Sequence, residues 1–301
     1  MKTGFEKKNS LFTATFIITS SILLIVLLAT IFAGVIAPYP PEKLDIKNKL
    51  QGMSAQHIFG TDKVGRDIFS RILYGGRTTL VSAFLVVLIS VVIGVPAGLI
   101  CGYYGKKIDG IIMNIWNIIL GVPSILLAFM IMSFTGRGIK AGIIAIGIVY
   151  IPMISRLTRS VTMIEKNKNY VEASKVLGYS NFRIITLHIL PNCIPTLMAE
   201  LTLDLAYAIL DLAGLSFLGL GVQAPQSDWG YMLSDAQQFL TSNPIQAIVP
   251  GTLIIVVVIS LNLLSNEVMG YIDPKLRSVI SFKRYNRLQK RFEDRQRRKA
   301  A

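Results

Sequence analysis

Three acidic residues lie inside one otherwise apolar stretch of the sequence, residues 192–220. Glu200, Asp204 and Asp211 are 4 and 11 positions apart, and at about 100° per helical residue they fall within roughly 40° of one another on one helix face. A carboxylate inside a bilayer costs several kcal/mol and normally faces the protein interior or a water-filled cavity. One hypothesis is therefore that these acids line a translocation path and attract a cationic substrate or the amino end of a peptide.

A second hypothesis is that the same three acids pair with polar side chains on neighbouring helices and have no contact with a substrate. The candidate partners are Asn114, Asn117, Asn262 and Asn266. The sequence leaves both hypotheses open.

The sequence contains no set of residues typical of an enzyme. The phosphate-binding pattern GxxxxGK[ST], the GxSxG elbow and the HExxH zinc pattern are all absent. His57 and His188 are the only histidines, and Cys101 and Cys193 are the only cysteines, too few and too scattered for a metal site or a disulfide framework. We predict no catalytic residue, no metal ligand and no cofactor bound by this chain. Its function must lie in a path through a membrane, in partner binding, or in both.

Composition indicates a membrane protein. The chain is 52% hydrophobic and 16% charged, with a mean hydropathy of +0.56, whereas a soluble domain carries about a quarter charged residues. A bilayer core about 30 Å thick needs roughly 20 apolar helical residues. Six segments meet this need or nearly do: 11–37, 79–103, 111–134, 139–154, 192–220 and 245–271. The predicted fold is an all-α polytopic membrane protein with six transmembrane helices, and the first segment is too long for a cleaved signal peptide.

The distribution of Lys and Arg predicts the orientation. With both termini in the cytoplasm, the inside segments hold 22 Lys and Arg and the outside segments hold 9. We therefore predict a cytoplasmic tail over 1–10, a permease-like membrane domain over 11–271 and a basic cytoplasmic tail over 272–301. Residues 273–301 hold 11 Lys/Arg against 3 Asp/Glu, and a tail next to a membrane helix explains this charge better than binding to nucleic acid does.

The only long internal loop, residues 155–191, has the pattern of two helices and a sharp turn. Tyr170 to Leu177 favours a helix with Glu172 near its positive end, and Gly178 can end it in a left-handed conformation. An apolar helix resumes over 182–190, and Pro191 suits the first turn of the next span. This loop could present a rigid knob to a soluble partner or lie as an amphipathic hairpin on the headgroups.

This loop resembles the EAA loop of membrane subunits in bacterial ATP-binding-cassette importers. The resemblance rests on Glu172-Ala173-Ser174, Gly178 and Leu190-Pro191; Ser174 stands where the family has a second alanine, and His188 stands where it often has isoleucine. In that family the short helix docks on a separate ATPase subunit. The resemblance implies an ATPase-coupling role for Tyr170, Glu172, Ala173, Ser174, Gly178, Leu190 and Pro191.

Three more segments resemble the C-type permeases for dipeptides, oligopeptides and nickel. They are residues 59–71, residues 215–223 together with Trp229-Gly230, and residues 273–277. In the first of them, Asp67 can cap a separate helix over 68–73 that lies in the outer interface. We expect Arg66, Arg71 and Arg77 to make structural or headgroup contacts.

The resemblance implies a set of partners and a transport function. The partners are a second permease subunit forming a heterodimer, two ATP-binding-cassette ATPase subunits that bind the ATP, an extracytoplasmic substrate-binding protein, and the lipid of the cell inner membrane. The expected substrates are di- or oligopeptides, with nickel or a metal chelate as the alternative. A secondary transporter driven by an ion gradient would use the acids as a relay, but it predicts inverted repeats, and none is seen. A membrane receptor or anchor would leave the internal loop unexplained.

Overall fold

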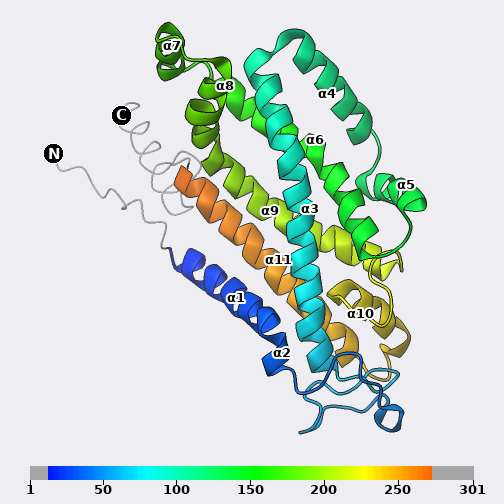
Figure 1. Cartoon of the computed structure of the whole chain (residues 1–301). Helices are drawn as coiled ribbons and strands as arrows, with labels where there is room; N and C mark the ends of the chain where they lie inside the picture. Colours follow the sequence, from blue (N-terminus) through cyan, green and yellow to red (C-terminus); the bar gives the residue numbers. More distant parts are fainter. Residues whose placement is uncertain (1–12, 273–301) are drawn as a thin grey trace, which may run out of the picture.

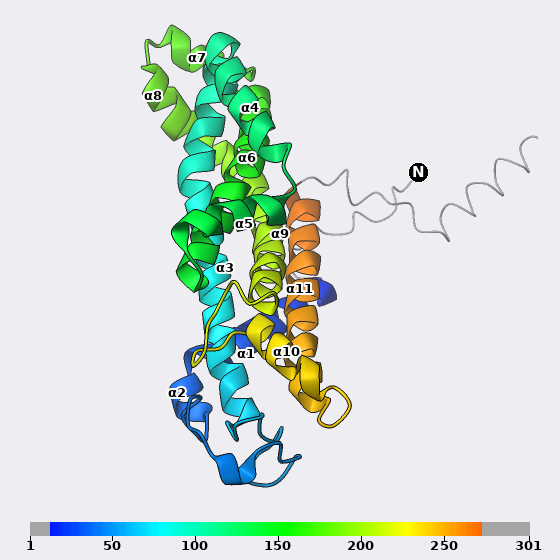
Figure 2. The same cartoon turned by 90° about the vertical axis from the view of Figure 1, so that its right-hand side faces the viewer.

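The computed structural model describes residues 13–272 as a bundle of helices (Figures 1 and 2). Among these residues there is no strand, only an isolated bridge between Thr61 and Asp67. The longer helices are α1 (Ala14–Ile31), α3 (Ile68–Tyr104), α4 (Lys106–Leu120), α5 (Ser124–Thr135), α6 (Ile139–Glu165), α9 (Leu190–Phe217) and α11 (Ile245–Ile272). The shorter ones are α2 (Ala33–Ile36), α7 (Asn169–Val176), α8 (Asn181–Arg183) and α10 (Trp229–Ala236), besides one π-helical and two 3₁₀ turns. The all-α prediction is confirmed.

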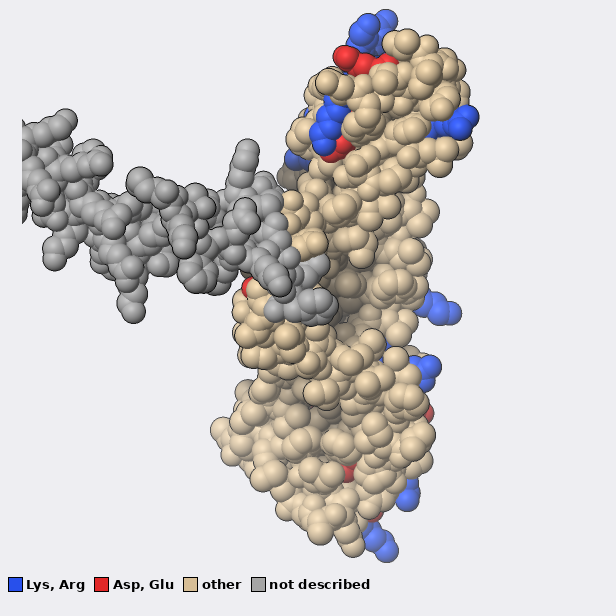
Figure 3. Space-filling view, turned by 90° about the vertical axis from the view of Figure 1, so that its left-hand side faces the viewer, with Lys and Arg blue, Asp and Glu red and all other residues tan. Residues whose placement is uncertain are grey.

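Five helices in the described part of the chain are long and apolar enough to cross a membrane, or six if α4 and α5 form one bent span. On the face shown in Figure 3, charged side chains gather at the α7 end and are scattered, mostly along one edge, from mid-height to the opposite end, while most of the surface between is uncharged. We call these the α7 end and the α10 end. Figure 1 places α7 at one and the loop of residues 38–67 at the other. The predicted tails over 1–10 and 273–301 lie outside the described residues.

The third predicted span, residues 111–134, is wrong as a continuous helix. The chain makes a bend of 91° between α4 and α5. The bend follows from Gly121-Val122-Pro123, because a residue before proline avoids the helical region and proline donates no backbone hydrogen bond. The short fourth segment, 139–154, is in turn too short as predicted, since α6 continues to Glu165.

The second span begins earlier than predicted. Instead of a separate interfacial helix over 68–73 and a span from residue 79, α3 is one helix of 37 residues from Ile68 to Tyr104. Asp67 caps it as expected, with its Oδ2 accepting a hydrogen bond from the Ser70 backbone N–H at 2.7 Å. The two predicted pieces are joined without a break. Gly75 and Gly76, which lie between them, remain helical and buried.

The fifth span is continuous with the second helix of the internal loop, so the predicted boundary at Pro191 is wrong. Residues 181–217 form one apolar helix, with a π-helical turn over Ile184–Ile189. Pro191 is the second residue of α9, directly after this π turn, and Pro195 lies one turn further on. A proline removes one N–H and clashes with the carbonyl four residues earlier, and a wider π turn is one way for a helix to absorb such a defect.

Helices α3 and α6 pack backbone to backbone through three glycines spaced four residues apart. A methyl group added at Gly98 would lie 2.5 Å from the Ser155 carbonyl oxygen, and one at Gly94 would lie 2.9 Å from the Ile151 carbonyl oxygen. A methyl group added at Gly102 would lie 2.6 Å from the Thr162 Cβ and 2.8 Å from the Arg159 carbonyl oxygen. Small residues at this spacing let membrane helices approach closely, which is their main means of association in lipid. This contact fixes α6 along the C-terminal part of α3.

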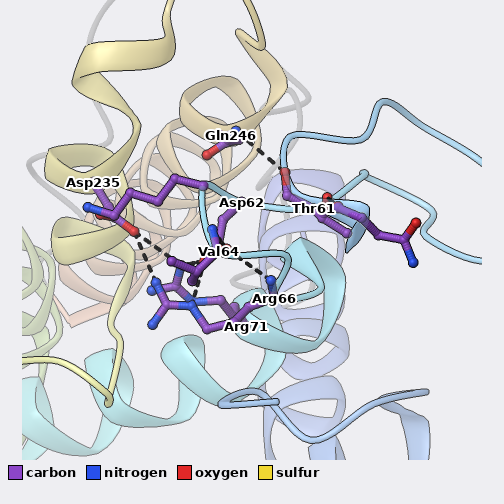
Figure 4. Close-up of polar contacts among 9 residues, drawn as sticks. Thr61, Asp62, Val64, Arg66, Arg71, Asp235 and Gln246 are labelled. Carbon is purple, nitrogen blue, oxygen red and sulfur yellow. Dashed lines mark hydrogen bonds and ion pairs between the residues drawn. The ribbon is translucent and has the colours of Figure 1, made fainter. Parts of the chain in front are cut away.

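A buried cluster of charges joins the loop of residues 38–67 to α10 (Figure 4). The Asp62 carboxylate pairs with Arg66 at 2.6 Å and with Arg71, and Asp235 lies 3.3 Å from both guanidinium groups and 2.6 Å from the Lys63 ammonium. Burial raises the pKa of the Asp235 carboxyl, but the hydrogen bond from Lys63 and the charge of Arg71 outweigh it, and the pKa is lowered. Arg66 and Arg71 make the structural contacts that we expected, whereas Arg77 is exposed.

Replacing Gly98 with alanine tests the α3–α6 contact. The added methyl group has no room beside the Ser155 carbonyl, so we expect a loss of about 1–3 kcal/mol of stability, in the range for overpacking. The measurement is the melting temperature of the purified chain in detergent.

The matched control is Gly110→Ala in α4, where an added methyl group meets nothing within 4 Å and helix propensity improves. An equal melting temperature for the two variants would contradict the packing described.

Candidate functional site

The short helix predicted over 170–177 is present as α7, which lies at one end of the bundle, level with the turn between α3 and α4 (Figure 1). It spans Asn169–Val176 and places Glu172 in its first turn, as expected. Gly178 ends it with a φ of +77°. The Tyr179 N–H bonds to the Ser174 carbonyl at 3.1 Å and the Gly178 N–H bonds to the Lys175 carbonyl at 3.0 Å, the paired bonds of a Schellman cap.

One face of α7 is buried in a small apolar core of its own. Val171 is fully buried and Ser174 is 5% exposed. Val171 belongs to a cluster contributed by α3, the π turn and α9: Leu99, Ile184, Ile185, Ile189, Cys193 and Leu197. The Ser174 hydroxyl donates to the Tyr170 carbonyl at 2.8 Å. Serine therefore fits at the buried position where the family has alanine, because its hydroxyl is satisfied within the helix.

Glu165, the last residue of α6, holds α7 in place. Its carboxylate accepts a hydrogen bond from the Tyr170 hydroxyl at 2.7 Å and pairs with the Lys168 ammonium at 2.6 Å. Burial raises the pKa of the Tyr170 hydroxyl, and the bond to Glu165 raises it further. The neighbouring Lys166 donates to the Gly102 carbonyl at 2.8 Å at the end of α3. α7 is thus fixed to α6, and the start of its linker is fixed to α3.

The opposite face of α7 is exposed and partly apolar. Val176 is 88% exposed and Leu177 is 70% exposed, and Glu172, Ala173, Lys175 and Gly178 are exposed beside them. We call these six residues the α7 tip. Pro191 is also exposed and Leu190 is half-buried, both on α9 below the tip. A rigid helix with one anchored face and one free apolar face can dock in a groove of a soluble partner, and this role stays a prediction.

The three acids of α9 lie along the helix as predicted, but they differ in their surroundings. Asp204 is 2% exposed and its Oδ2 has no hydrogen-bond partner. Asp211 is half-buried and accepts a hydrogen bond from the Tyr150 hydroxyl of α6 at 2.8 Å. Glu200 is half-buried. Their role in a translocation path stays a prediction; Asp204 is enclosed within this subunit.

The asparagines considered as partners of these acids have other contacts where the structure gives any. The Asn117 amide oxygen accepts from Arg156, and the Asn262 amide donates to the Val258 carbonyl at 2.9 Å. Within residues 13–272, the hydrogen bond found for these acids is that between Tyr150 and Asp211, which the sequence analysis missed because the two residues lie 61 positions apart in the chain.

Three polar contacts that the sequence analysis also missed fix α4 against α6. The Arg159 guanidinium forms a two-pronged pair with Asp109, at 2.6 Å for the Nη2–Oδ2 contact. The Trp116 indole donates to the Ser155 hydroxyl at 3.0 Å, and Arg156 donates to Asn117. The sequence did carry a sign of these contacts: Asp109 and Asn117 lie beside and within one apolar segment, and Arg156 and Arg159 lie three residues apart just after the next one.

No group of three or more His, Cys, Asp and Glu side chains that could hold a metal ion occurs within residues 13–272. The predicted absence of catalytic residues and of a cofactor is not tested by this.

Comparison with known proteins finds a family model and several relatives that match most of this chain. The family model for the binding-protein-dependent transport system inner membrane component matches residues 94–278. The chain is 42% identical over 272 residues to the dipeptide transport system permease protein DppC of Alkalihalophilus pseudofirmus, covering 90% of this chain and 88% of that protein. It is 35% identical over 263 residues to the glutathione transport system permease protein GsiD of Pectobacterium atrosepticum, covering 87% of each.

Among solved structures, the chain is similar to the MetNI methionine ABC transporter in an inward-facing conformation. The TM-score is 0.56 with 21% identity, over 67% of this chain and 96% of that chain. At this identity the likeness supports the fold alone.

Replacing Glu165 with alanine tests how α7 is held. The change removes the acceptor of Tyr170 and the ion pair of Lys168, and hydrogen bonds to charged groups contribute about 1.5–3 kcal/mol. We expect the amides of α7 to exchange with solvent at least about tenfold faster, measured by hydrogen–deuterium exchange. Glu172→Ala, at an exposed position of the same helix, is the control, and equal exchange in both variants would refute the anchoring role.

Proposed function

We propose that this chain, which belongs to the family of inner membrane components of binding-protein-dependent transport systems, carries peptides across the membrane as one half of an ATP-driven importer. The chain is a multi-pass permease of the ATP-binding-cassette importer class. The peptide substrate is supported by relatives whose names carry dipeptide and glutathione, at 42% and 35% identity over most of their lengths.

The observation that carries the mechanism is the anchoring of α7. Its buried face packs on α3 and α9 residues, and Glu165 binds it to α6. We infer that an ATPase subunit binds the α7 tip, so that closure of the ATPases displaces α7, α6 and α3 as one body. The path would then open alternately to the two sides of the membrane.

The proposed assembly has five parts. This chain pairs with a second, similar permease subunit, because a path between two bundles needs both walls. Two ATPase subunits bind the ATP, consistent with the lack of a phosphate-binding loop in this sequence, and a binding protein delivers the substrate from outside. The chain itself hydrolyses nothing in this proposal.

The proposed orientation places the α7 end in the cytoplasm of the cell and the α10 end outside. This agrees with the excess of Lys and Arg in the segments assigned to the inside. It also places the chain's two ends in the cytoplasm.

Two alternatives receive less support. Nickel or a metal chelate would use the same machinery, but the relatives compared carry peptide names. A secondary transporter would use the acids of α9 as a relay, and the family match gives it no support.

Leu177→Asp tests the docking role of the α7 tip. Leu177 is 70% exposed, so the change leaves the fold intact but places a charge in an apolar contact, which is costly unless paired. We expect the amount of ATPase that co-purifies with the permease to fall at least tenfold, with ATP-driven uptake lost in proportion.

Ile46→Asp is the matched control, since Ile46 is 71% exposed in the loop at the α10 end. Retention of the ATPase by Leu177→Asp, or equal loss in both variants, would contradict the proposal.

A further inference from the structure

An arginine is exposed within a helix that is long and apolar enough to cross a membrane. Arg156 of α6 is exposed. Its neighbour Ser155 lies against Gly98 of α3, since a methyl group added at Gly98 would lie only 2.5 Å from the Ser155 carbonyl oxygen. Gly98 is seven residues before Gly105, where α3 ends, which is roughly 10 Å of helix. On α3 itself, the exposed side chains around this level are Ile93, Pro96 and Ile100, all of them apolar.

The polar surface around Arg156 continues towards the α7 end. α4 and α6 run antiparallel here, because Asp109 pairs with Arg159 and Trp116 with Ser155. One turn beyond Asn117 on α4 is Asn114, and one turn beyond Arg156 on α6 is Ser160; both are exposed. We call Asn114, Asn117, Arg156 and Ser160 the polar face. Polar and charged groups inside a membrane segment normally face a water-filled cavity or the bundle interior rather than lipid.

Arg156 also differs from its neighbour Arg159 in charge balance. Arg159 is neutralised by Asp109. Within residues 13–272, no carboxylate lies within ion-pair distance of Arg156, whose hydrogen bond is to the neutral Asn117 amide. A guanidinium has five N–H donors in a fork that matches a carboxylate. Asn117 orients Arg156, and donors remain for a ligand.

We infer that the polar face is this subunit's wall of the translocation path and that Arg156 binds the carboxylate of the passing substrate there. This rests on the proposed function, because every peptide with a free carboxyl end carries such a group. One arginine that faces a water-filled path would hold the carboxylate weakly enough for it to leave again, as conduction requires.

Cysteine labelling in the complete importer, held in lipid nanodiscs, tests the wall. Ser160→Cys and Asn114→Cys should react with a charged, membrane-impermeant methanethiosulfonate. Ile100→Cys, close to the same depth on α3, should react at least about tenfold more slowly. The native Cys101 and Cys193 are both buried and give the background in the unsubstituted chain. Equal reaction at Ser160 and Ile100 would show that this level is simply outside the membrane, and no reaction at Ser160 would show that lipid or protein covers the face. Either result overturns the inference.

Protection from labelling tests the carboxylate. Dialanine at millimolar concentration should slow the labelling of Ser160→Cys at least twofold, and dialanine amide should not. Adding Arg156→Gln should abolish the protection, and adding Lys107→Gln, an exposed charge at the start of α4, should not. Protection that persists with Arg156→Gln, or equal protection by the amide, would remove the assigned role.

Uptake separates this inference from the proposed function. If the unsubstituted importer in proteoliposomes takes up no peptide, the proposed function fails. If it does take up peptide and Arg156→Gln stays within twofold of it, only the role of Arg156 fails. If Arg156→Gln does not assemble, labelling of Ser160→Cys with dialanine and its amide decides the matter alone.

Discussion

The close backbone contact between α3 and α6 is the constraint on which the other features depend. In lipid, apolar side chains gain little by leaving their solvent, so helices associate through close packing and polar contacts. Gly94, Gly98 and Gly102 let α6 approach α3 until side-chain and carbonyl atoms of α6 occupy the space of the missing methyl groups. Because α6 ends in Glu165 and carries Arg156 and Arg159, this one contact sets the positions of both α7 and α4.

Several polar groups of the bundle are paired with groups from another helix or from the loop of residues 38–67. Asp211 is bonded to Tyr150, Asp109 to Arg159, and Asp62 with Asp235 to two arginines. Removing one partner of a buried pair leaves an uncompensated charge, which costs about 3–5 kcal/mol. Such pairs therefore fix which helices lie together, even where the pair itself adds little net stability. Asp204 and Arg156 depart from this pattern: the Asp204 Oδ2 is enclosed without a hydrogen-bond partner, and Arg156 is exposed and bonded to a neutral amide instead of a carboxylate.

Much of the fold was predictable because its causes are local in the sequence. The apolar run at 245–271 predicted α11 to within one residue, and the run at 192–220 predicted the end of α9 to within three, although the helix that contains α9 already begins at residue 181. Gly178 ended α7 as expected, since only a left-handed residue closes that cap. The break at Gly121-Val122-Pro123 was also local, but hydropathy averaged over the segment hid it. By contrast, the continuity of α3 before Thr79 depends on packing: a methyl group added at Gly75 would lie 3.3 Å from the Asp228 Cα, and one added at Gly76 would lie 2.7 Å from the Trp229 ring.

The α7 tip and the polar face also differ in how far the sequence alone could predict them. The short helix that carries the α7 tip was predicted because Tyr170 to Gly178 form one stretch that resembles a known loop, but Lys175, Val176 and Leu177 were not among the residues assigned a coupling role. The polar face was not predicted, because Asn114 and Asn117 are about 40 residues from Arg156 and Ser160 in the chain, and their common exposure follows only from how α4 folds back on α6. The acids of α9 were correctly placed on one helix, yet the burial of Asp204 depends on the helices around α9 and not on its spacing.

The most direct measurement is of distances within this subunit during the ATP cycle. Spin labels at Lys175 on the α7 tip and Arg77 on α3, both exposed, report whether α7 and α3 move together. In the complete importer, pulsed electron paramagnetic resonance should give the same distance without nucleotide and with a non-hydrolysable ATP analogue, while the distance from Arg77 to the second permease changes. A shift of about 5 Å, one helical turn, between Lys175 and Arg77, with the distance between permeases constant, would contradict the movement of α7, α6 and α3 as one body.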